Sequence, residues 1–284
     1  MKVVVLGGAG QIGSALVAHL IELGHTSKSI DILNNSDHDL RCVKRIWTDE
    51  LHGADFVFFL AFDVGGSQYL AKYERNKQFL DNNLMIMLNV FKELESSKKP
   101  FVFASSQMSN MNFSPYGILK RIGEFYSHSL GGVICKFWNV YGFENSPEKN
   151  HVITDFIEMA LTVREINMRT SGNEKRQFLF SQDACEALVT LMDNYMNLDK
   201  TQIYDITSHE WTSILEIANL IARFTQSKVI LGVQNDLVQQ DLLNEPNRNM
   251  LNFWKPRFNL HEGIWELLKI SNVKINFSDL ESEF

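Results

Sequence analysis

The chain has 284 residues, 45% of them hydrophobic, which is long enough for one large α/β domain or a large and a small one. Its formal net charge is -7, and the absence of a basic block excludes the electrostatic footprint of a protein that binds nucleic acid or anionic membranes. The three cysteines lie far apart in no metal-ligand spacing, which predicts reduced thiols and no metal site. They are Cys42, Cys135 and Cys185.

The first residues predict neither a secretion signal nor a membrane anchor. The apolar run after Lys2 meets Gly7 and Gly8 too early for the core of a signal peptide. The longest unbroken apolar run, residues 56–62, is too short to span a bilayer. We therefore expect a cytoplasmic protein without a membrane partner.

Strand-like and helix-like segments alternate through the first half of the chain. A β-rich run at 2–7 precedes apolar residues at helical spacing over 12–24, and Gly24 is a plausible helix stop. Strand candidates follow at 29–33 and 54–62, the second being continuously apolar and thus typical of a strand covered on both faces. The pattern continues with a helix at 82–97, a strand at 100–106, a helix at 116–132 and a strand segment at 132–142.

The second half is less regular. Amphipathic helices are predicted at 152–162, 182–195 and 211–225, with short strand candidates at 177–180, 202–207 and 228–233. Alternating strands and helices imply parallel βαβ units. We predict an α/β fold: a Rossmann-type doubly wound parallel sheet over residues 1–145, and a smaller C-terminal α/β substrate lobe over 146–284, from which some segments return to the first domain.

Gly7, Gly10 and Gly13 stand three residues apart between the first strand and the first helix. In a dinucleotide-binding loop the first glycine makes a tight turn, the second lets the backbone approach the pyrophosphate, and the third allows close packing of helix and strand. Asp31 follows 18 residues after Gly13, where a carboxylate binds the adenosine ribose and repels a 2′-phosphate. The pattern predicts NAD as the cofactor; the alternative is a set of ordinary turn glycines with a surface aspartate.

Tyr116 and Lys120 are one helical turn apart, so their side chains project from the same face of the predicted helix. Tyrosine has a pKa near ~10 and is a poor base at neutral pH, but an adjacent ammonium and an oxidised nicotinamide would lower that pKa. The spacing predicts a proton-transfer pair. We expect Ile118, Ile122 and Phe125 to anchor the helix on its buried side.

Beyond the glycine loop, five ordered landmarks resemble the extended short-chain dehydrogenase/reductase family, the NAD-dependent nucleotide-sugar epimerases and dehydratases. They are "VFFLAF", "SPYGILK", "KFWNVYG", "KRQFLFSQDACEAL" and "FWKPRFNLHEGI". The resemblance covers nearly the whole chain. One departure is Lys136, which stands where the family usually has arginine.

The resemblance implies roles for individual residues. Tyr116 would take the proton from a sugar hydroxyl while hydride leaves the same carbon for the nicotinamide, and Lys120 would also hold the nicotinamide ribose. Ser106 aligns with the residue that hydrogen-bonds the reacting oxygen, and Ser105 is its competitor. The implied contacts to NAD are Gly7, Gly10, Gln11, Ile12, Gly13, Asp31, Leu60, Ala61, Tyr116 and Lys120.

The residues after the serine limit the chemistry. Family members that eliminate water carry an acid and a base there, whereas this chain has Gln107 and Met108. The loop also lacks the cysteine of the GDP-sugar branch that abstracts a carbon-bound proton. Elimination and C5 epimerisation are therefore not supported. The step of ten residues from Ser106 to Tyr116 is shorter than is usual in the family, which predicts a more open pocket.

Substrate contacts are expected from the loop after residue 62 and from the C-terminal lobe. "LAFDVGGSQYL" resembles a loop of the GDP-sugar branch, so a GDP-linked sugar is one option; Asp63 would bind the sugar or cap the next helix, and Gly65 would belong to a flexible loop near the substrate. Guanidinium groups bind phosphate in a bidentate way. Asn139, Arg176 and Arg248 are the candidates for the diphosphate and the base, and His151 is either a second acid/base or a solvated loop histidine.

The sequence thus predicts an NAD-dependent enzyme that oxidises C4 of a nucleoside-diphosphate sugar, as a 4-epimerase or a 4-dehydrogenase. One alternative is an NAD(P)H-dependent 4-keto-sugar reductase. Another is a non-catalytic NAD-binding regulatory protein of the same fold. By resemblance, we expect a homodimer that forms through the helices at 82–97 and 116–132.

Overall fold

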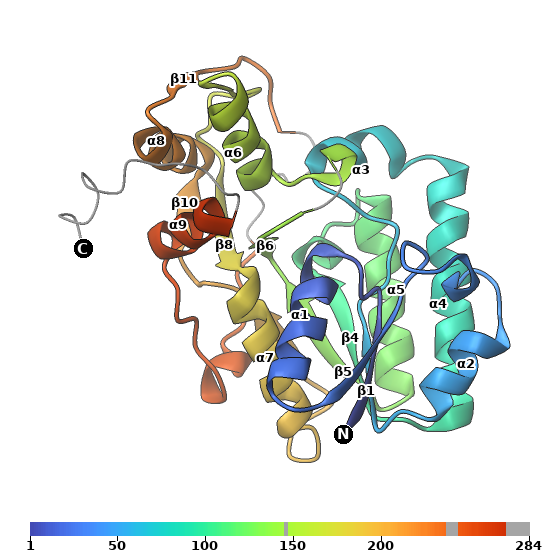
Figure 1. The fold of residues 1–284 in the computed structure, drawn as a ribbon. Helices are drawn as coiled ribbons and strands as arrows, with labels where there is room; N and C mark the ends of the chain where they lie inside the picture. Colours follow the sequence, from blue (N-terminus) through green and yellow to red (C-terminus); the bar gives the residue numbers. More distant parts are fainter. Residues whose placement is uncertain (145–146, 237–243, 271–284) are drawn as a thin grey trace.

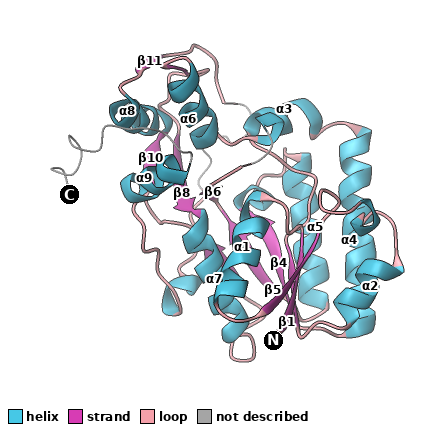
Figure 2. Cartoon of the chain, in the orientation of Figure 1, coloured by secondary structure: helices cyan, strands magenta, loops and turns pink. Residues whose placement is uncertain are grey.

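The computed structural model describes residues 1–144, 147–236 and 244–270. The centre of the molecule is a six-stranded sheet in the order β2-β1-β3-β4-β5-β9, and each neighbouring pair runs parallel (Figures 1 and 2). Its strands are β1 (Lys2–Leu6), β2 (Thr26–Ile30), β3 (Phe56–Phe59), β4 (Phe101–Ser106), β5 (Val133–Phe137) and β9 (Ile203–Ile206). The predicted doubly wound, Rossmann-type sheet is confirmed.

Helices cover both faces of this sheet. On one face lie α1 (Gln11–Glu22) and α7 (Ser181–Asp193), and on the other α2 (Arg45–His52), α4 (Lys77–Ser97) and α5 (Pro115–Ser129) (Figure 1). Successive side chains of a strand point to opposite faces, so Val3 and Val5 enter the first core while Val4 and Leu6 enter the second. Because both faces are covered, every residue of β1 after Lys2 is apolar.

The C-terminal lobe is built around two small sheets. One has the order β10-β8-β6, from β6 (Asn139–Tyr141), β8 (Lys175–Phe180) and β10 (Trp211–Ser213); the other pairs β7 (Glu165–Asn167) with β11 (Lys228–Ile230). A third apolar core joins these sheets to α6 (Val152–Thr162), α8 (Ile214–Thr225) and α9 (Leu260–Ile270). The remaining helical segments are α3 (Ser67–Tyr73) and the 3-10 turns Ser36–His38, Gln107–Asn110, Pro147–Lys149 and Asn249–Asn252.

Two segments from the second half of the chain belong to the main sheet and the helices that cover it. Strand β9 pairs with β5 at the sheet edge, and α7 packs beside α1 in the same apolar core. The predicted boundary between residues 145 and 146 lies outside the described residues. The division into domains 1–145 and 146–284 therefore stays a prediction.

Helix α5 begins where its sequence favours a helix start. The Ser114 side chain accepts a hydrogen bond from the amide of Gly117 at 3.1 Å, and Pro115 occupies the first helical position. The expected anchoring was wrong for Ile118, which is 45% exposed, and for Phe125, which is 65% exposed, whereas Ile122 is partly buried and packs against the core. Instead, the helix turns its small and polar side toward β4, where a Cβ on Gly123 would come within 2.3 Å of the Phe103 ring.

The topology of the main sheet marks one place for a ligand. The chain leaves β1 to form β2 on one side and then returns to form β3 on the other, so the strand order reverses between β1 and β3. In open α/β sheets, ligands bind beyond the carboxyl ends of the strands at such a reversal. Residues 7–13, 31, 60–63 and 105–116 all follow the carboxyl ends of these strands.

Candidate active site

The glycine loop between β1 and α1 contains two glycines that the chain itself requires. Gly7 has a φ of +86°, and a Cβ there would lie 2.6 Å from the Ala61 amide nitrogen. A Cβ on Gly13 would lie 2.1 Å from the Gly7 carbonyl oxygen. A larger side chain at Gly7 would therefore push the loop away from the end of β3, and one at Gly13 would push α1 away from the loop.

Gly10 is different, because the described chain leaves room for a Cβ. The nearest atom, the Gly7 carbonyl oxygen, would be 3.4 Å away, and the φ of Gly10 is -71°. Next to it, the buried Nε2 atom of Gln11 has no hydrogen-bond partner among the described residues. An open glycine, an unpartnered side-chain donor and the N-terminus of a 12-residue helix together fit the pyrophosphate of a dinucleotide.

Asp31 stands at the carboxyl end of β2, beside the loop. Its carboxylate accepts hydrogen bonds from the amide of Ala9 at 3.1 Å and from the amide of Leu33 at 2.9 Å. The carboxylate thus fixes the glycine loop against the turn after β2. This is the position from which it would reach the adenosine ribose.

The other predicted cofactor contacts border the same loop. The amide of Leu60 donates to the carbonyl oxygen of Leu6 at 2.9 Å, which continues the pairing of β3 with β1. Ala61 is buried in the core beneath α4 and α5, and Ile12 packs against the opposite core. Leu60 and Ala61 follow β3 beside Gly7, and Ile12 lies within the glycine loop segment itself, so all three border the loop.

Ser106 and Tyr116 lie together at the carboxyl end of β4. The two side chains are neighbours, and the Ser106 oxygen accepts a hydrogen bond from the amide of Met108 at 3.2 Å. Tyr116 is buried, with its ring 5.7 Å from that of Phe62. Burial raises the pKa of Tyr116 to about 12, and the neighbouring Ser106 hydroxyl opposes this rise.

Lys120 lies one turn further along α5 and is also buried. Its Nζ donates to the carbonyl oxygen of Ala104 at 2.7 Å and lies 3.9 Å from the centre of the Phe62 ring. Burial lowers the pKa of Lys120 to about 7, against the negative charge of Glu124. Burial disfavours the charged form of both groups, which opposes the lowering of the Tyr116 pKa that is expected from the ammonium and an oxidised nicotinamide together.

The competing serine has another partner. Ser105 donates its hydroxyl to Glu124 Oε1 at 2.5 Å, on the side of β4 that α5 covers. The structure therefore brings Ser106, not Ser105, to Tyr116. Around them, the short connection from Ser106 forms one 3-10 turn whose Gln107 side chain accepts from Asn244 at 2.7 Å. Asn244, from the second half of the chain, thus contacts the connection between Ser106 and Tyr116, where the short step predicts a more open pocket.

Asp63 is satisfied within the chain. Its carboxylate accepts from Tyr69 at 2.6 Å and from Asn82 at 3.0 Å, and pairs with Lys149 at 3.2 Å. Although burial opposes it, these contacts lower the pKa of Asp63. A Cβ on Gly65 would lie 2.9 Å from the Tyr69 side chain, so this glycine serves the packing of the same loop.

The remaining predicted substrate residues are spread over the C-terminal lobe. Arg176 is buried and pairs with Asp236 at 2.8 Å, and Asn139 donates to the carbonyl oxygen of Gln177 at 3.4 Å. Arg248 is exposed at the start of a 3-10 turn. No contact places these three side chains together with Ser106, Tyr116 and Lys120 in the described residues.

His151 caps α6 and has a defined partner. Its Nδ1 lies 2.6 Å from Glu144 Oε1, and its amide donates to the other oxygen of the same carboxylate at 2.9 Å. The histidine is thus held in place rather than free in solvent. It follows Asn150, whose buried Oδ1 has no hydrogen-bond partner among the described residues.

Several residues of the site were missed in the sequence. Gly8 is required because a Cβ there would lie 2.3 Å from the Ser29 hydroxyl. Glu124 lies eight residues after Tyr116 on the same helix face, a spacing that could have identified it. No sequence pattern marks Asn150, because its burial depends on the tertiary packing of the segment around Gly66.

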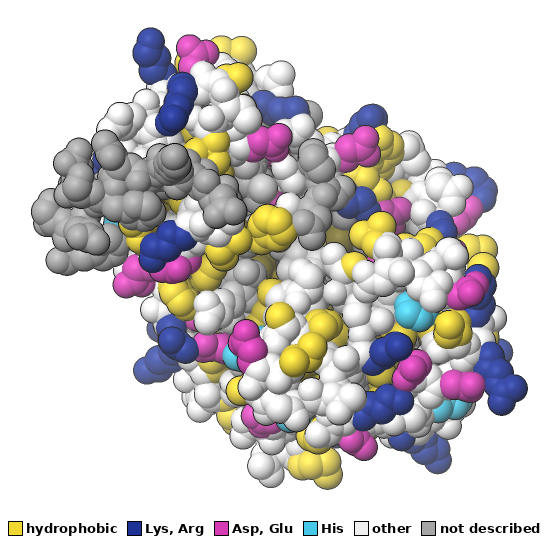
Figure 3. Space-filling model, in the orientation of Figure 1, with side chains coloured by type: hydrophobic (Ala, Val, Ile, Leu, Met, Phe, Trp, Pro, Cys, Tyr) yellow, Lys and Arg dark blue, Asp and Glu magenta, His cyan; other side chains and the backbone are white. Residues whose placement is uncertain are grey.

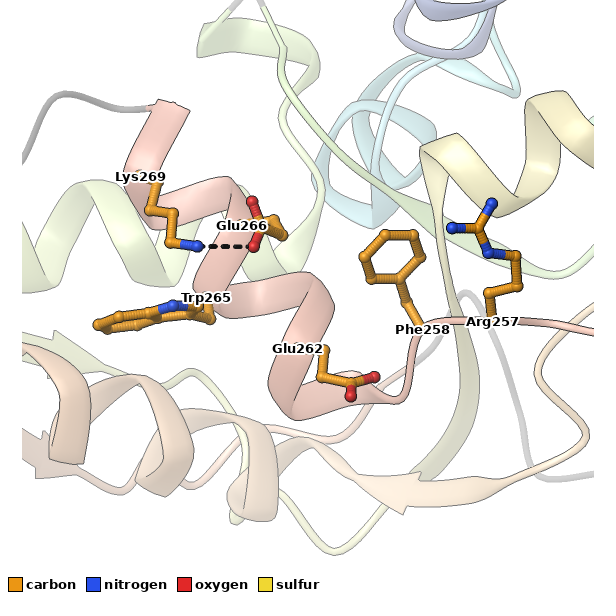
Figure 4. Close-up of a pocket in the computed structure, with 6 residues that line it drawn as sticks. All are labelled: Arg257, Phe258, Glu262, Trp265, Glu266 and Lys269. Atoms are coloured by element: carbon orange, nitrogen blue, oxygen red, sulfur yellow. Dashed lines mark hydrogen bonds and ion pairs between the residues drawn. The ribbon is translucent and has the colours of Figure 1, made fainter. Parts of the chain in front are cut away.

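A pocket of ≈ 370 Å³ lies elsewhere, along α9 (Figure 4). Glu266 and Lys269 form an ion pair across part of it at 2.7 Å. It contains none of the predicted site residues, so it is separate from the candidate active site. Its lining is Arg257, Phe258, Glu262, Trp265, Glu266 and Lys269.

The described residues contain neither a membrane-spanning helix nor a metal-binding cluster. On the face drawn in Figure 3, acidic and basic side chains are interspersed. None of the helices in the described ranges combines the length and apolar character that crossing a membrane requires. Within the same ranges, no group of three or more His, Cys, Asp and Glu side chains is arranged to hold a metal ion.

The fold and the site together define a class, the dinucleotide-binding oxidoreductases with a serine, tyrosine and lysine at the end of a parallel sheet. Comparison with known proteins gives the family. The sequence profile described as "NAD dependent epimerase/dehydratase family" matches residues 3–207, and the chain belongs to that family. Its cofactor is NAD.

Relatives across the family differ in their named reactions. The chain is 26% identical to a probable GDP-L-fucose synthase of Oryza sativa, over 96% of this chain and 93% of the relative. It is also 26% identical to a UDP-N-acetyl-alpha-D-glucosaminuronate decarboxylase of Bacillus cytotoxicus, over 80% and 81%. A putative UDP-glucose 4-epimerase of Methanocaldococcus jannaschii is 26% identical over 92% and 95%.

Solved structures share the fold. UDP-glucose 4-epimerase of Thermotoga maritima superimposes with a TM-score of 0.78 at 20% identity, over 96% of this chain and 99% of the other. The enzyme WbmF of Bordetella bronchiseptica, solved with NAD+, gives 0.77 at 24% identity, over 99% and 94%. The predicted family, fold and cofactor are thereby confirmed, whereas the particular reaction is not fixed at this level of identity.

Proposed function

We propose that this protein catalyses the NAD-dependent oxidation of the C4 hydroxyl of a nucleoside-diphosphate sugar, as a 4-epimerase or a 4-dehydrogenase. The observation that carries the proposal is the position of Ser106 beside Tyr116 at the carboxyl end of β4, with Lys120 buried one turn further along α5. The family of the chain and the nucleotide sugars in the names of its relatives support the same substrate class.

The residues of the chain would act on the sugar hydroxyl in sequence. Ser106 would hydrogen-bond the reacting oxygen, and Tyr116 would take its proton. Lys120, fixed by the Ala104 carbonyl, would provide the nearby positive charge when protonated. Bound NAD would supply the hydride acceptor and, through its oxidised nicotinamide, a second positive charge that stabilises the phenolate.

The residues that would hold NAD are those beside the open face of the glycine loop. Gly10 and the Gln11 side chain would receive the pyrophosphate, and Asp31 would accept from the adenosine ribose. Gly7 and Gly13 would shape the loop rather than touch the cofactor. Ile12, Leu60 and Ala61 would border it.

The test is absorbance at the NADH band while UDP-, GDP- and dTDP-sugars are added in turn to the protein with NAD. A 4-dehydrogenase accumulates NADH, and a 4-epimerase converts the sugar without net reduction, as product analysis shows. If NAD binds but no sugar nucleotide binds, the enzyme proposal fails and a non-catalytic NAD-binding protein is favoured. If a 4-keto sugar oxidises NADH or NADPH instead, the protein is a reductase.

We further propose a homodimer formed through α4 and α5. Large apolar side chains lie exposed on these two adjacent helices, which a second copy would cover. Light scattering is expected to give twice the mass of one chain, and Leu88→Glu, which places a charge in this surface, is expected to give a monomer. A wild-type monomer would contradict the proposal. The exposed residues are Leu84, Met85, Leu88, Ile118, Phe125 and Tyr126.

A further inference from the structure

A buried ion pair lies directly behind the proposed catalytic serine. Glu124 is on α5, in line with Tyr116 and Lys120 at intervals of four residues, and is 5% exposed. The Nζ atom of Lys136, which is 4% exposed on β5, lies 3.3 Å from Glu124 Oε1. A buried ion pair is not by itself evidence for stability, so its position calls for a separate explanation.

The Glu124 carboxylate holds two serines on either side of Ser106. Its Oε1 accepts from Ser105 at 2.5 Å and from Ser109 at 2.6 Å. Ser105 is the residue before Ser106 on β4, and Ser109 lies in the 3-10 turn that follows. One charged oxygen therefore fixes both ends of the short segment that carries the proposed catalytic serine, with charge-assisted hydrogen bonds.

Lys136 connects this segment to the C-terminal lobe. It lies opposite Ser105 in the pairing of β4 with β5, and opposite Asp205 in the pairing of β5 with β9. Its Nζ also donates to Asn110 Oδ1 at 3.1 Å, and Asn110 donates to Asn244 Oδ1 at 2.7 Å. The ammonium group of Lys136 can donate separate hydrogens to Glu124 and to Asn110. This gives a physical reason for a lysine at a position where the family usually has arginine.

We propose that Glu124, with Lys136 as its counter-ion, is a positioning residue that holds Ser106 against Tyr116. The role rests on the proposed function, because it concerns the geometry in which the sugar hydroxyl would be bound. Neither residue touches the reacting atoms. Their effect is to keep the strand end and the 3-10 turn in one arrangement, and a misplacement of about 1 Å at a reacting group costs roughly 100-fold in rate.

The first test replaces the pair by neutral side chains of similar size, Glu124→Gln with Lys136→Met, so that neither member of the pair is left buried without the other. The double variant is expected to fold, to bind NAD with unchanged affinity, and to lose roughly 10- to 100-fold in kcat with little change in KM. The substrate is whichever UDP-, GDP- or dTDP-sugar the wild type converts. Wild-type kcat in this variant would overturn the proposal.

Two further variants separate positioning from stability. Lys136→Arg keeps the charge and is expected to retain most of the kcat. Ser105→Ala with Ser109→Ala leaves the ion pair intact but removes both links to Ser106, and is expected to lose kcat as the first variant does. If the Glu124→Gln, Lys136→Met variant does not fold, the Ser105→Ala, Ser109→Ala variant tests the proposal. An unchanged kcat in that variant would overturn it.

A readout without substrate distinguishes this proposal from the proposed function. In crystals grown with NAD, the Ser106 Oγ to Tyr116 Oη distance is expected to stay within hydrogen-bond range in the wild type and to exceed about 3.5 Å in the double serine variant. A preserved bond overturns the positioning role. A wild type that converts no nucleotide sugar overturns the proposed function, while the crystallographic comparison still tests the positioning.

Discussion

The cofactor side and the substrate side of the molecule differ in how their polar groups are partnered. At the start of α1, Gly10 faces open space and the Gln11 amide has no partner among the described residues. Around the loop after β3, by contrast, the Asp63 carboxylate already has three partners, and Arg176 is paired with Asp236. A group without a partner can receive a ligand at no cost in existing contacts, whereas a satisfied group must first give one up.

The comparison therefore separates two kinds of prediction. On the cofactor side, substitution of a residue that faces open space, such as Gly10, should change NAD binding while the fold survives. On the substrate side, the residues chosen from the sequence should affect stability more than substrate affinity. Four experiments test this difference.

The largest effect is expected for Tyr116→Phe. The substitution removes the proposed proton acceptor but keeps the ring that packs against Phe62. Turnover should fall by about 10²- to 10⁴-fold, because general acid–base catalysis contributes on that scale. NAD affinity, measured by calorimetry, should remain that of the wild type; unchanged turnover would remove Tyr116 from the mechanism.

Lys120→Met tests the buried charge. The pKa of Lys120 is about 7 in the folded chain and 10.5 as a free side chain, so the unfolded state binds the extra proton between these two values. The free energy of unfolding of the wild type should rise with pH across this window, and the variant should lack that rise. Near neutral pH, the free energy of unfolding should differ between the wild type and the variant by a few kcal/mol. Denaturant titrations at several pH values measure it, and parallel profiles would contradict the burial of a titrating amine.

The two glycines of the loop form a matched pair. Gly13→Ala should disrupt the loop, because its Cβ would lie 2.1 Å from a carbonyl oxygen, whereas Gly10→Ala meets only an ordinary contact at 3.4 Å. Gly10→Ala should keep the melting temperature and weaken NAD binding by roughly 10- to 100-fold, about 1–3 kcal/mol of crowding. If Gly10→Ala binds NAD as the wild type does, the open face of the loop is not the cofactor site.

Asp63→Asn should have the smallest effect on catalysis. It weakens the hydrogen bonds from Tyr69 and Asn82 and the pair with Lys149, with an expected loss of about 1–3 kcal/mol in the free energy of unfolding. Because these contacts lower the pKa of Asp63, the stability they contribute should decline as the pH falls through that lowered value. A raised KM with unchanged stability would return Asp63 to the substrate site.

The parts of the site that follow local chain patterns could be predicted from the sequence. The glycine spacing, the acid after β2 and the Tyr-Lys interval each reflect one strand–turn–helix unit, and the structure brings them to the same edge of the sheet. The partners of Asp63 and Arg176 could not be predicted, because Lys149 and Asp236 lie 86 and 60 residues further along the chain. Those pairings depend on the tertiary fold.

The orientation of α5 shows a second limit. Helical spacing groups Ile118, Ile122 and Phe125 on one side, but it does not say whether that side faces the same chain or a surface. The sheet beneath α5 leaves room for Gly123 and the charged side chains of Lys120 and Glu124, so the polar side is the buried one. The Glu124–Lys136 pair was missed for the same reason, since charged residues are rarely expected in a core.

The late arrival of β9 at the edge of the main sheet has a consequence for how the chain folds. A fragment that stops before residue 145 would leave the edge of β5 without its neighbour, and an unpaired edge strand is a template for aggregation. The six-stranded sheet can be completed only after residues 203–206 have been synthesised, because they form its edge strand beside β5. Pairing over such a sequence separation slows folding, so the nucleotide-binding half is expected to mature only when most of the second half is already present.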